Sequence, residues 1–240
     1  MTSPARNHFL RASAALAAQA EQEANPLRHA NGYELMLAQL AEHKRQLKQV
    51  QSVERKADTK RRMLPEYAAW VEGVLQADSG TQDDIFMTVL VWRIDVGDFA
   101  GALPLAEYAI RHKLAMPDQY QRTTACLIAE EFANMVLKDP AAIQSADVEA
   151  LVEVEALVRD QDMPDEVRAK LHKALGYIIA AVATGHDQAT ANACREEALA
   201  HLRRALELHD KSGVKKDIER IERDIKNAAA AGTKNRTGKS

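Results

Sequence analysis

Glycine, proline and aromatic residues are scarce in this chain of 240 residues, which has 10 Gly, 7 Pro and 5% aromatic residues. Few helix breakers in a sequence rich in Ala, Leu, Glu, Lys and Arg favour helix, because these residues lose little conformational freedom there. Strand segments of alternating polarity between turn residues are missing as well. The sequence therefore predicts an all-α fold, with a long N-terminal helical arm followed by an irregular stack of helical hairpins.

Cysteine is also rare, and the two residues present, Cys126 and Cys194, fall inside amphipathic helical segments. Two cysteines without a CxxC spacing do not make a disulfide framework, and they indicate free thiols in a reducing compartment. The chain has no apolar run of about 18 residues, the length that a membrane span needs, and no signal-peptide core. We therefore expect an intracellular protein without membrane contact.

Motifs for cofactors and metals are missing too. The chain has no GxGxxG or GxxxxGK[ST] phosphate loop and no GxSxG nucleophile motif. Its eight histidines show no ligand spacing: His201 and His209 are two turns apart, and His172 and His186 fall on different segments. We therefore expect no cofactor, no metal site and no catalytic residue in this chain.

What the chain does have is a block of positive charge, Lys44 to Arg62, on an otherwise acidic chain. The block holds eight Lys/Arg against two acids, whereas residues 78–210 hold 23 Asp/Glu against 12 Lys/Arg. Such a cluster binds duplex nucleic acid through phosphate contacts, and the block has no aromatic residue for stacking on single strands. The alternatives are a solvated helix face or pairing with an acidic neighbouring chain. The candidate DNA-binding residues are Lys44, Arg45, Lys48, Arg55, Lys56, Lys60, Arg61 and Arg62.

Hydrophobic periodicity predicts four parts. Residues 1–30 form a flexible segment with at most a short helix, and residues 31–77 form a basic arm for DNA binding and oligomerisation. Residues 81–230 form a helical body, and residues 231–240 a disordered basic tail. Within the arm, one helix about 48 Å long spans residues 31–62, with an apolar stripe available to another chain. The stripe consists of Tyr33, Met36, Leu40, Leu47, Val50 and Ala57.

The body reads as paired helices joined by short polar links, with expected ranges of 81–96, 98–113, 116–138, 148–158, 165–184, 189–210 and 214–230. Residues 97–110 and 194–208 resemble the second helix of a tetratricopeptide repeat (TPR). A 34-residue period is absent, so we expect an irregular TPR-like stack rather than a regular array.

Carboxylates near the arm are the candidates for metal-dependent chemistry, which needs clustered acids. Asp83 and Asp84 are adjacent, and Asp95 and Asp98 flank a glycine at an expected helix end. Thr81 and Asp84 have the spacing of a helix capping box. We interpret the four aspartates as helix-end residues, with metal ligands of a nuclease as the alternative.

Residues 79–133, SGTQDDIFMTVLVWRIDVGDFAGALPLAEYAIRHKLAMPDQYQRTTACLIAEEFA, resemble the terminase small subunit of P2-like tailed bacteriophages. Residues 54–75 and 2–11 fit the same family, and the resemblance covers about residues 1–210. It implies a subunit in the host cytoplasm that binds double-stranded phage DNA at the cohesive-end site. It also implies self-assembly, usually as a ring, and recruitment of the terminase large subunit, an ATPase. The family is often labelled the endonuclease subunit, which implies DNA cutting within the terminase.

Three functions are open at this point. The first, which we favour, is a non-catalytic DNA-recognition and assembly subunit of a packaging terminase. The second is a metal-dependent endonuclease that cuts cohesive ends, and the third is a TPR-like adaptor that binds only proteins. Residues 31–75 show no helix-turn-helix element, so the sequence gives no sign of how specific bases are read.

Overall fold

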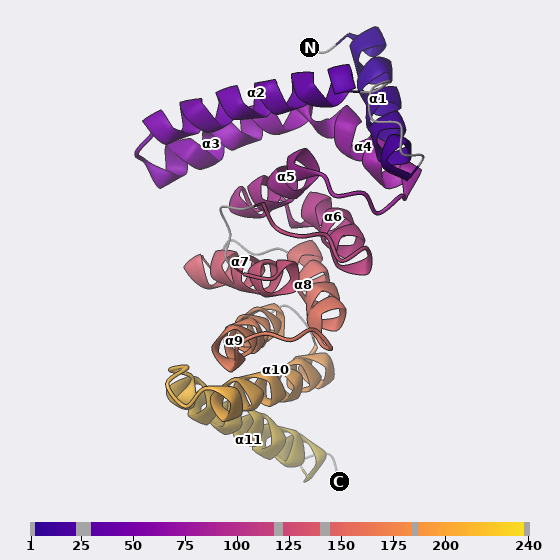
Figure 1. The fold of residues 1–240 in the computed structure, drawn as a ribbon. Coiled ribbons are helices and arrows are strands. Elements are labelled where there is room, and N and C mark those ends of the chain that lie inside the picture. Colours follow the sequence, from indigo (N-terminus) through magenta and orange to yellow (C-terminus); the bar gives the residue numbers. More distant parts are fainter. Residues whose placement is uncertain (1–2, 23–29, 118–121, 140–144, 184–186, 238–240) are drawn as a thin grey trace. The chain divides into compact units, whose positions relative to one another are not determined.

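The computed structural model describes residues 3–22, 30–117, 122–139, 145–183 and 187–237 (Figure 1). Within these ranges all regular structure is helical, so the expected all-α fold is confirmed. None of the described helices combines the length and apolar character that a membrane span requires. The helices are α1 (Pro4–Gln22), α2 (Ala30–Gln49), α3 (Val53–Met63), the 3₁₀ turn η2 (Leu64–Glu66), α4 (Ala68–Ala77), α5 (Asp84–Asp95), α6 (Phe99–Arg111), α7 (Thr124–Lys138), α8 (Ser145–Val158), α9 (Asp165–Val182), α10 (Gln188–Leu208) and α11 (Lys215–Thr237).

The chain divides into two compact units, unit 1 over Met1–Thr124 and unit 2 over Ala125–Ser240. Unit 1 places α5 and α6 with the helices before them, whereas the sequence suggested a division between the arm and the body at residues 77–81. Two aromatic side chains make this connection. The Trp70 indole donates to Asp83 at 2.8 Å, and the Tyr67 ring meets the Trp92 ring edge-on, with centroids 5.9 Å apart.

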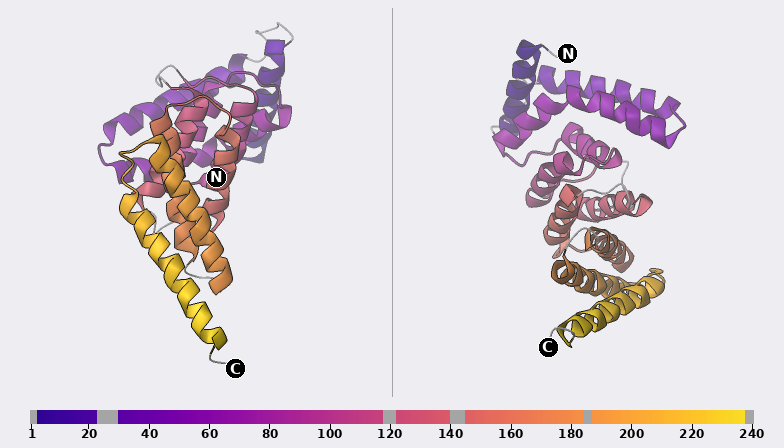
Figure 2. Two further views of the ribbon diagram at one scale, coloured as in Figure 1. Left: turned by 90° about the horizontal axis from the view of Figure 1, so that it is seen from below. Right: turned by 180° about the vertical axis from the view of Figure 1, so that it is seen from behind.

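The basic block does not lie on one long helix, so the expectation for residues 31–62 is wrong. α2 ends at Gln49 and α3 begins at Val53. Ser52 has extended backbone angles (φ −65°, ψ 127°), and its hydroxyl accepts the backbone N–H of Arg55 at 3.3 Å. This N-cap starts a new helix, so the chain turns back and α2 and α3 lie side by side as a hairpin (Figures 1 and 2).

The apolar stripe of α2 is used inside unit 1. Met36, Leu40 and Leu47 are all less than 10% exposed. His43 of α2 contacts Tyr67, which lies between η2 and α4. The Tyr67 hydroxyl lies 2.8 Å from Nδ1 of His43, and the two rings meet edge-on. These side chains are therefore buried against neighbouring helices, and the stripe does not offer another chain the free surface that the sequence suggested.

The N-terminal segment contains a packed helix, although the sequence suggested a flexible segment over residues 1–30. Leu10 and Ala14 of α1 are buried, and α1 packs on α4. The approach is close because residue 73 is glycine: a Cβ there would lie 2.6 Å from the carbonyl oxygen of Arg11. The small residues Ala14 and Gly73 therefore let α1 pack closely on α4. Asn25 and Pro26, the expected end of this helix, lie outside the described residues.

Unit 2 is built around the pair α9 and α10. Gly176 allows their close contact, because a Cβ there would lie 2.6 Å from the side chain of Leu202. The TPR-like segments lie in α6 and α10, each of which packs on the helix before it; the resemblance to the repeat itself stays a prediction. α11 extends to Thr237, beyond the end expected near residue 230, and residues 238–240 of the expected disordered tail lie outside the described residues.

Candidate nucleic-acid interface

The α2–α3 hairpin carries all eight cationic residues expected to bind DNA, and the structure separates them into two groups. In the first group, other parts of unit 1 take up the charge. The Lys60 ammonium forms an ion pair with Asp95 of α5, and only 16% of the Lys60 side chain is exposed. Arg61 donates to Asp58 at 2.7 Å and to the carbonyl of Val96 at 3.1 Å. These contacts hold α3 against α5 and the turn that follows it.

Lys44 and Arg45 have acidic neighbours of their own. Burial lowers the pKa of the half-buried Lys44 ammonium, the nearby Asp84 carboxylate opposes this pKa shift, and Lys48 adds to it. Arg45 forms an ion pair with Glu42 on the surface of α2. Surface pairs of this kind contribute little energy and exchange readily, so Arg45 remains accessible to a ligand whereas Lys44 is partly enclosed.

The second group has exposed charge at the turn of the hairpin and along α3. Lys48, Arg55 and Arg62 are exposed and Lys56 is half-buried, and none of the four forms an ion pair within the part of the chain that the structure describes. Among the described residues, the Arg62 guanidinium donates only to the hydroxyl of Thr59, at 3.3 Å. Uncompensated exposed cations attract phosphates most strongly, because no protein carboxylate competes for them.

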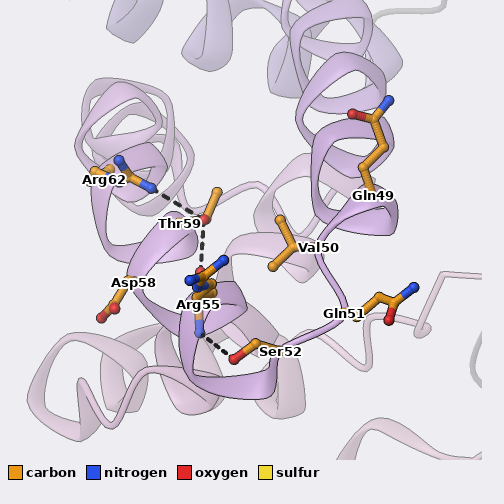
Figure 3. Close-up of a pocket in the computed structure, with 8 residues that line it drawn as sticks. All are labelled: Gln49, Val50, Gln51, Ser52, Arg55, Asp58, Thr59 and Arg62. Carbon is orange, nitrogen blue, oxygen red and sulfur yellow. Dashed lines mark hydrogen bonds between the residues drawn. The ribbon is translucent and has the colours of Figure 1, made fainter.

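An open hollow of about 670 Å³ lies at the turn of the hairpin (Figure 3). Arg55, Thr59 and Arg62 follow one face of α3, and Gln49 ends α2 on the other side. Asp58 is the only acid of the lining and is paired with Arg61 outside it. Cationic and neutral polar side chains therefore predominate in the hollow, which is lined by Gln49, Val50, Gln51, Ser52, Arg55, Asp58, Thr59 and Arg62.

Four neutral polar residues of this lining were not among the candidates from the sequence, which rested on charge alone. They are Gln49, Gln51, Ser52 and Thr59. A signal for two of them was available: Ser52, Arg55, Thr59 and Arg62 recur every three or four residues, the spacing of one helix face. The two glutamines carried no such signal, because their position depends on the turn at Ser52.

Asp83, the first of the aspartates near the arm, is buried and holds the start of α5. One carboxylate oxygen accepts the backbone N–H groups of Ile85 and Phe86 at 2.8 and 2.9 Å, and the other accepts the Trp70 indole N–H. Burial raises the pKa of the Asp83 carboxyl, and these three donors oppose the rise. Asp83 rather than Thr81 is the N-cap, so the expected capping box is wrong. The neighbouring Asp84 is exposed.

The other two aspartates also have partners. Asp95 is paired with Lys60, and Asp98 caps α6 by accepting the backbone N–H of Gly101 at 3.0 Å while pairing with Arg93. Among the described residues, no three His, Cys, Asp or Glu side chains gather closely enough to hold a metal ion. A nuclease with these four aspartates as ligands stays a prediction.

Two histidines that the sequence left on separate segments meet in unit 2. His172 of α9 and His201 of α10 have their Nδ1 atoms 3.0 Å apart and both are half-buried. This contact needs one nitrogen as donor and one as acceptor, so at least one ring must be neutral. Burial, then the neighbouring His201 ring, lowers the pKa of His172 to about 4, and burial lowers that of His201. The charged neighbours are Glu155 of α8, Arg168 of α9, and Glu197 and Arg204 of α10.

Acid should therefore destabilise unit 2 through this pair. The pKa of each ring is lower in the folded state than in the unfolded state. The contribution of the two rings to the stability of unit 2 is therefore present above pH 6.5 and is lost as the pH falls toward about 4. Screening at half-exposed rings limits the loss to roughly 1–2 kcal/mol. In thermal unfolding followed by circular dichroism, the fall in Tm on acidification should be smaller for H172Q/H201Q than for wild type. An equal fall in Tm for the two proteins would contradict the prediction. The fluorescence of Trp70 and Trp92, both in unit 1, is the internal control.

Comparisons with known proteins agree on one class. The sequence profile of the family "Phage small terminase subunit" matches residues 37–166, which include most of the hairpin and continue into unit 2. The chain is 49% identical over 226 residues to the "Terminase, endonuclease subunit" of Escherichia phage P2, covering 94% of this chain and 87% of the relative. It is 28% identical over 196 residues to the "Probable terminase, endonuclease subunit" of Haemophilus phage HP1, covering 80% and 70%. No solved structure matches the chain.

The all-helical fold and these matches define a protein of the phage DNA-packaging terminases. Within that class, the chain belongs to the phage small terminase subunit family. The resemblance noted in residues 2–11, 54–75 and 79–133 is thereby confirmed. Membership implies DNA and the terminase large subunit as partners.

Proposed function

We propose that this protein is the DNA-binding subunit of a packaging terminase and that it holds duplex DNA at the end of the α2–α3 hairpin. The observation that supports this most is the group of exposed cations there, Lys48, Arg55 and Arg62, which have no ion-pair partner within the described residues. Lys56 lies beside them. A cationic hairpin on a chain whose residues 78–210 are acidic brings phosphate to the hairpin and repels it from that acidic stretch.

The rest of the proposed function comes from the family. The subunit binds phage DNA at the cohesive-end site in the host cytoplasm, assembles with copies of itself as a ring, and recruits the large ATPase subunit. Self-assembly must use a surface other than the α2 stripe, because Met36, Leu40 and Leu47 are buried within unit 1. The acidic helical body over residues 81–210 carries the protein contacts in this proposal.

DNA cutting is a property that the names of both relatives give to those proteins. For this chain we propose that cutting belongs to the assembled terminase and that three of the four aspartates near the hairpin are structural. Asp83, Asp95 and Asp98 each hold a helix end or an ion pair. A nuclease test in this region should therefore substitute the exposed Asp84, since changes at the other three also disturb the fold.

A tethered cleavage reagent tests the proposed position of the DNA. Val53 is 70% exposed at the start of α3, and Val152 is 42% exposed in unit 2. We expect iron-EDTA attached to V53C to cut a bound duplex of mixed sequence, since hydroxyl radicals act only close to their source. The background is C194S, because Cys126 is buried.

V152C with the same reagent is the matched control, and it should cut little or nothing. If V152C cuts the duplex as well as V53C does, the hairpin is not the binding site. If neither protein cuts at low salt, where phosphate contacts are strongest, the DNA-binding proposal fails and an adaptor that binds only proteins becomes the better interpretation.

A further inference from the structure

Two glutamines at the end of the hairpin differ from the other glutamines of α2–α6. Gln39, Gln46 and Gln76 donate to glutamates on the same or a neighbouring helix, and Gln82 bonds to the backbone of Ala115. By contrast, the amides of Gln49 and Gln51 have no protein partner among the described residues. Both side chains are exposed beside the hollow lined by Arg55 (Figure 3).

From this difference we infer that Gln49 and Gln51 read base edges in the major groove of DNA. A glutamine amide offers a donor and an acceptor side by side, which matches the N6 and N7 groups of adenine. Phosphate oxygens offer only acceptors, so an amide is a poor phosphate ligand compared with the neighbouring cations. This inference rests on the proposed function, because it assigns specificity to the site where the duplex is held.

The surroundings of the two glutamines fit a groove better than a phosphate strand. Glu54 is exposed; its carboxylate would repel phosphate but can accept from the amino group of cytosine. Arg55 and Arg62 follow on one face of α3, where they are placed to hold the flanking phosphates.

The first turn of α3 is the part of the hairpin that the groove can accept. The major groove, about 12 Å wide, admits one α-helix. In recognition helices that enter this groove, the N-terminal residues contact bases while other elements cross the backbone. The first turn of α3 and the last residue of α2 stand together here, so the hairpin can present its polar end to the base edges and leave Lys48 for the phosphates.

The test compares specificity with affinity. Wild-type protein selects sequences from a pool of random duplexes, and binding is then measured to an enriched duplex and to a scrambled one. We expect Q49A/Q51A to lower the ratio of the two affinities by about 5- to 150-fold for each glutamine that pairs with a base. Its affinity for the scrambled duplex and the salt dependence of that affinity should stay at the wild-type level.

Q46A/Q76A is the matched control, since it removes two exposed amides that already bond to Glu42 and Glu72. It should keep the wild-type ratio. If selection enriches no sequence, or if Q49A/Q51A keeps the wild-type ratio, the hairpin contacts only phosphates and this inference is wrong while the proposed function stands. If wild-type protein binds neither duplex, both are wrong.

Discussion

Replacing Asp83 with alanine should lower the free energy of unfolding of unit 1 by about 3 kcal/mol. Two effects add up. The first is the missing cap of α5, because the N–H groups of Ile85 and Phe86 have no acceptor in the variant. The second is the Trp70 indole N–H, which stays buried and becomes unpaired. For a unit of this size, 3 kcal/mol corresponds to a fall in Tm of about 10 °C.

Asp84 provides the control for this prediction, because it is adjacent, equally charged and exposed. D84A should shift Tm by no more than a small fraction of the D83A shift. D83N keeps the shape and one acceptor oxygen and should be intermediate. Tryptophan fluorescence during thermal unfolding follows the transition, since Trp70 lies at the site. Equal Tm values for D83A and D84A would show that the buried carboxylate does not hold α5 in place.

Most of the helical body could be predicted from the sequence, because its helices are separated by strong local signals. Gly97, the Asp139-Pro140 pair and short polar links mark the ends, and apolar residues recur every three or four positions between them. The observed helices in this part begin and end close to the expected positions, apart from the later start of α7 at Thr124 and the later end of α11 at Thr237. Local rules therefore sufficed wherever a breaker residue stood at the boundary.

The turn at Ser52 shows where the local rules fail. Gln49, Val50 and Gln51 contain no glycine or proline, and the apolar spacing continues across them, so the sequence favoured one uninterrupted helix. A weak start signal was present, since Ser52 is a good N-cap and Glu54 is an acid in the first turn of α3. What decides between a straight helix and a hairpin is burial of Met36, Leu40 and Leu47 inside unit 1, which is a tertiary gain.

The position of the candidate site could be predicted from the sequence, but which of its cations are exposed to a ligand could not. The run of eight cations identified the right helices. Which of them are exposed depends on partners that are 35 residues away in the chain, such as Asp95 for Lys60 and the Val96 carbonyl for Arg61. The same limit applies to His172 and His201, which are 29 residues apart and meet only because α9 and α10 pack together.

Replacing the three exposed cations by alanine, in K48A/R55A/R62A, should have the largest effect on DNA binding. The plot of log affinity against log salt becomes shallower by about 0.9 for each phosphate that the protein no longer neutralises. If all three residues bind phosphates, the slope changes by about 2.7, so the ratio of affinities at about 50 and 200 mM salt falls by about 40-fold. The fold should be retained, because these side chains have no ion-pair partner within the described residues.

The most direct measurement of the hairpin's role is the slope of log affinity against log salt for three proteins on one duplex of mixed sequence. The three are K48A/R55A/R62A, wild type and K211A/K215A/K216A, and the last removes the same charge from exposed positions in unit 2. We predict a shallower slope for K48A/R55A/R62A and a wild-type slope for the unit 2 variant. A wild-type slope for K48A/R55A/R62A, or an equal change in both variants, would contradict DNA binding at the α2–α3 hairpin.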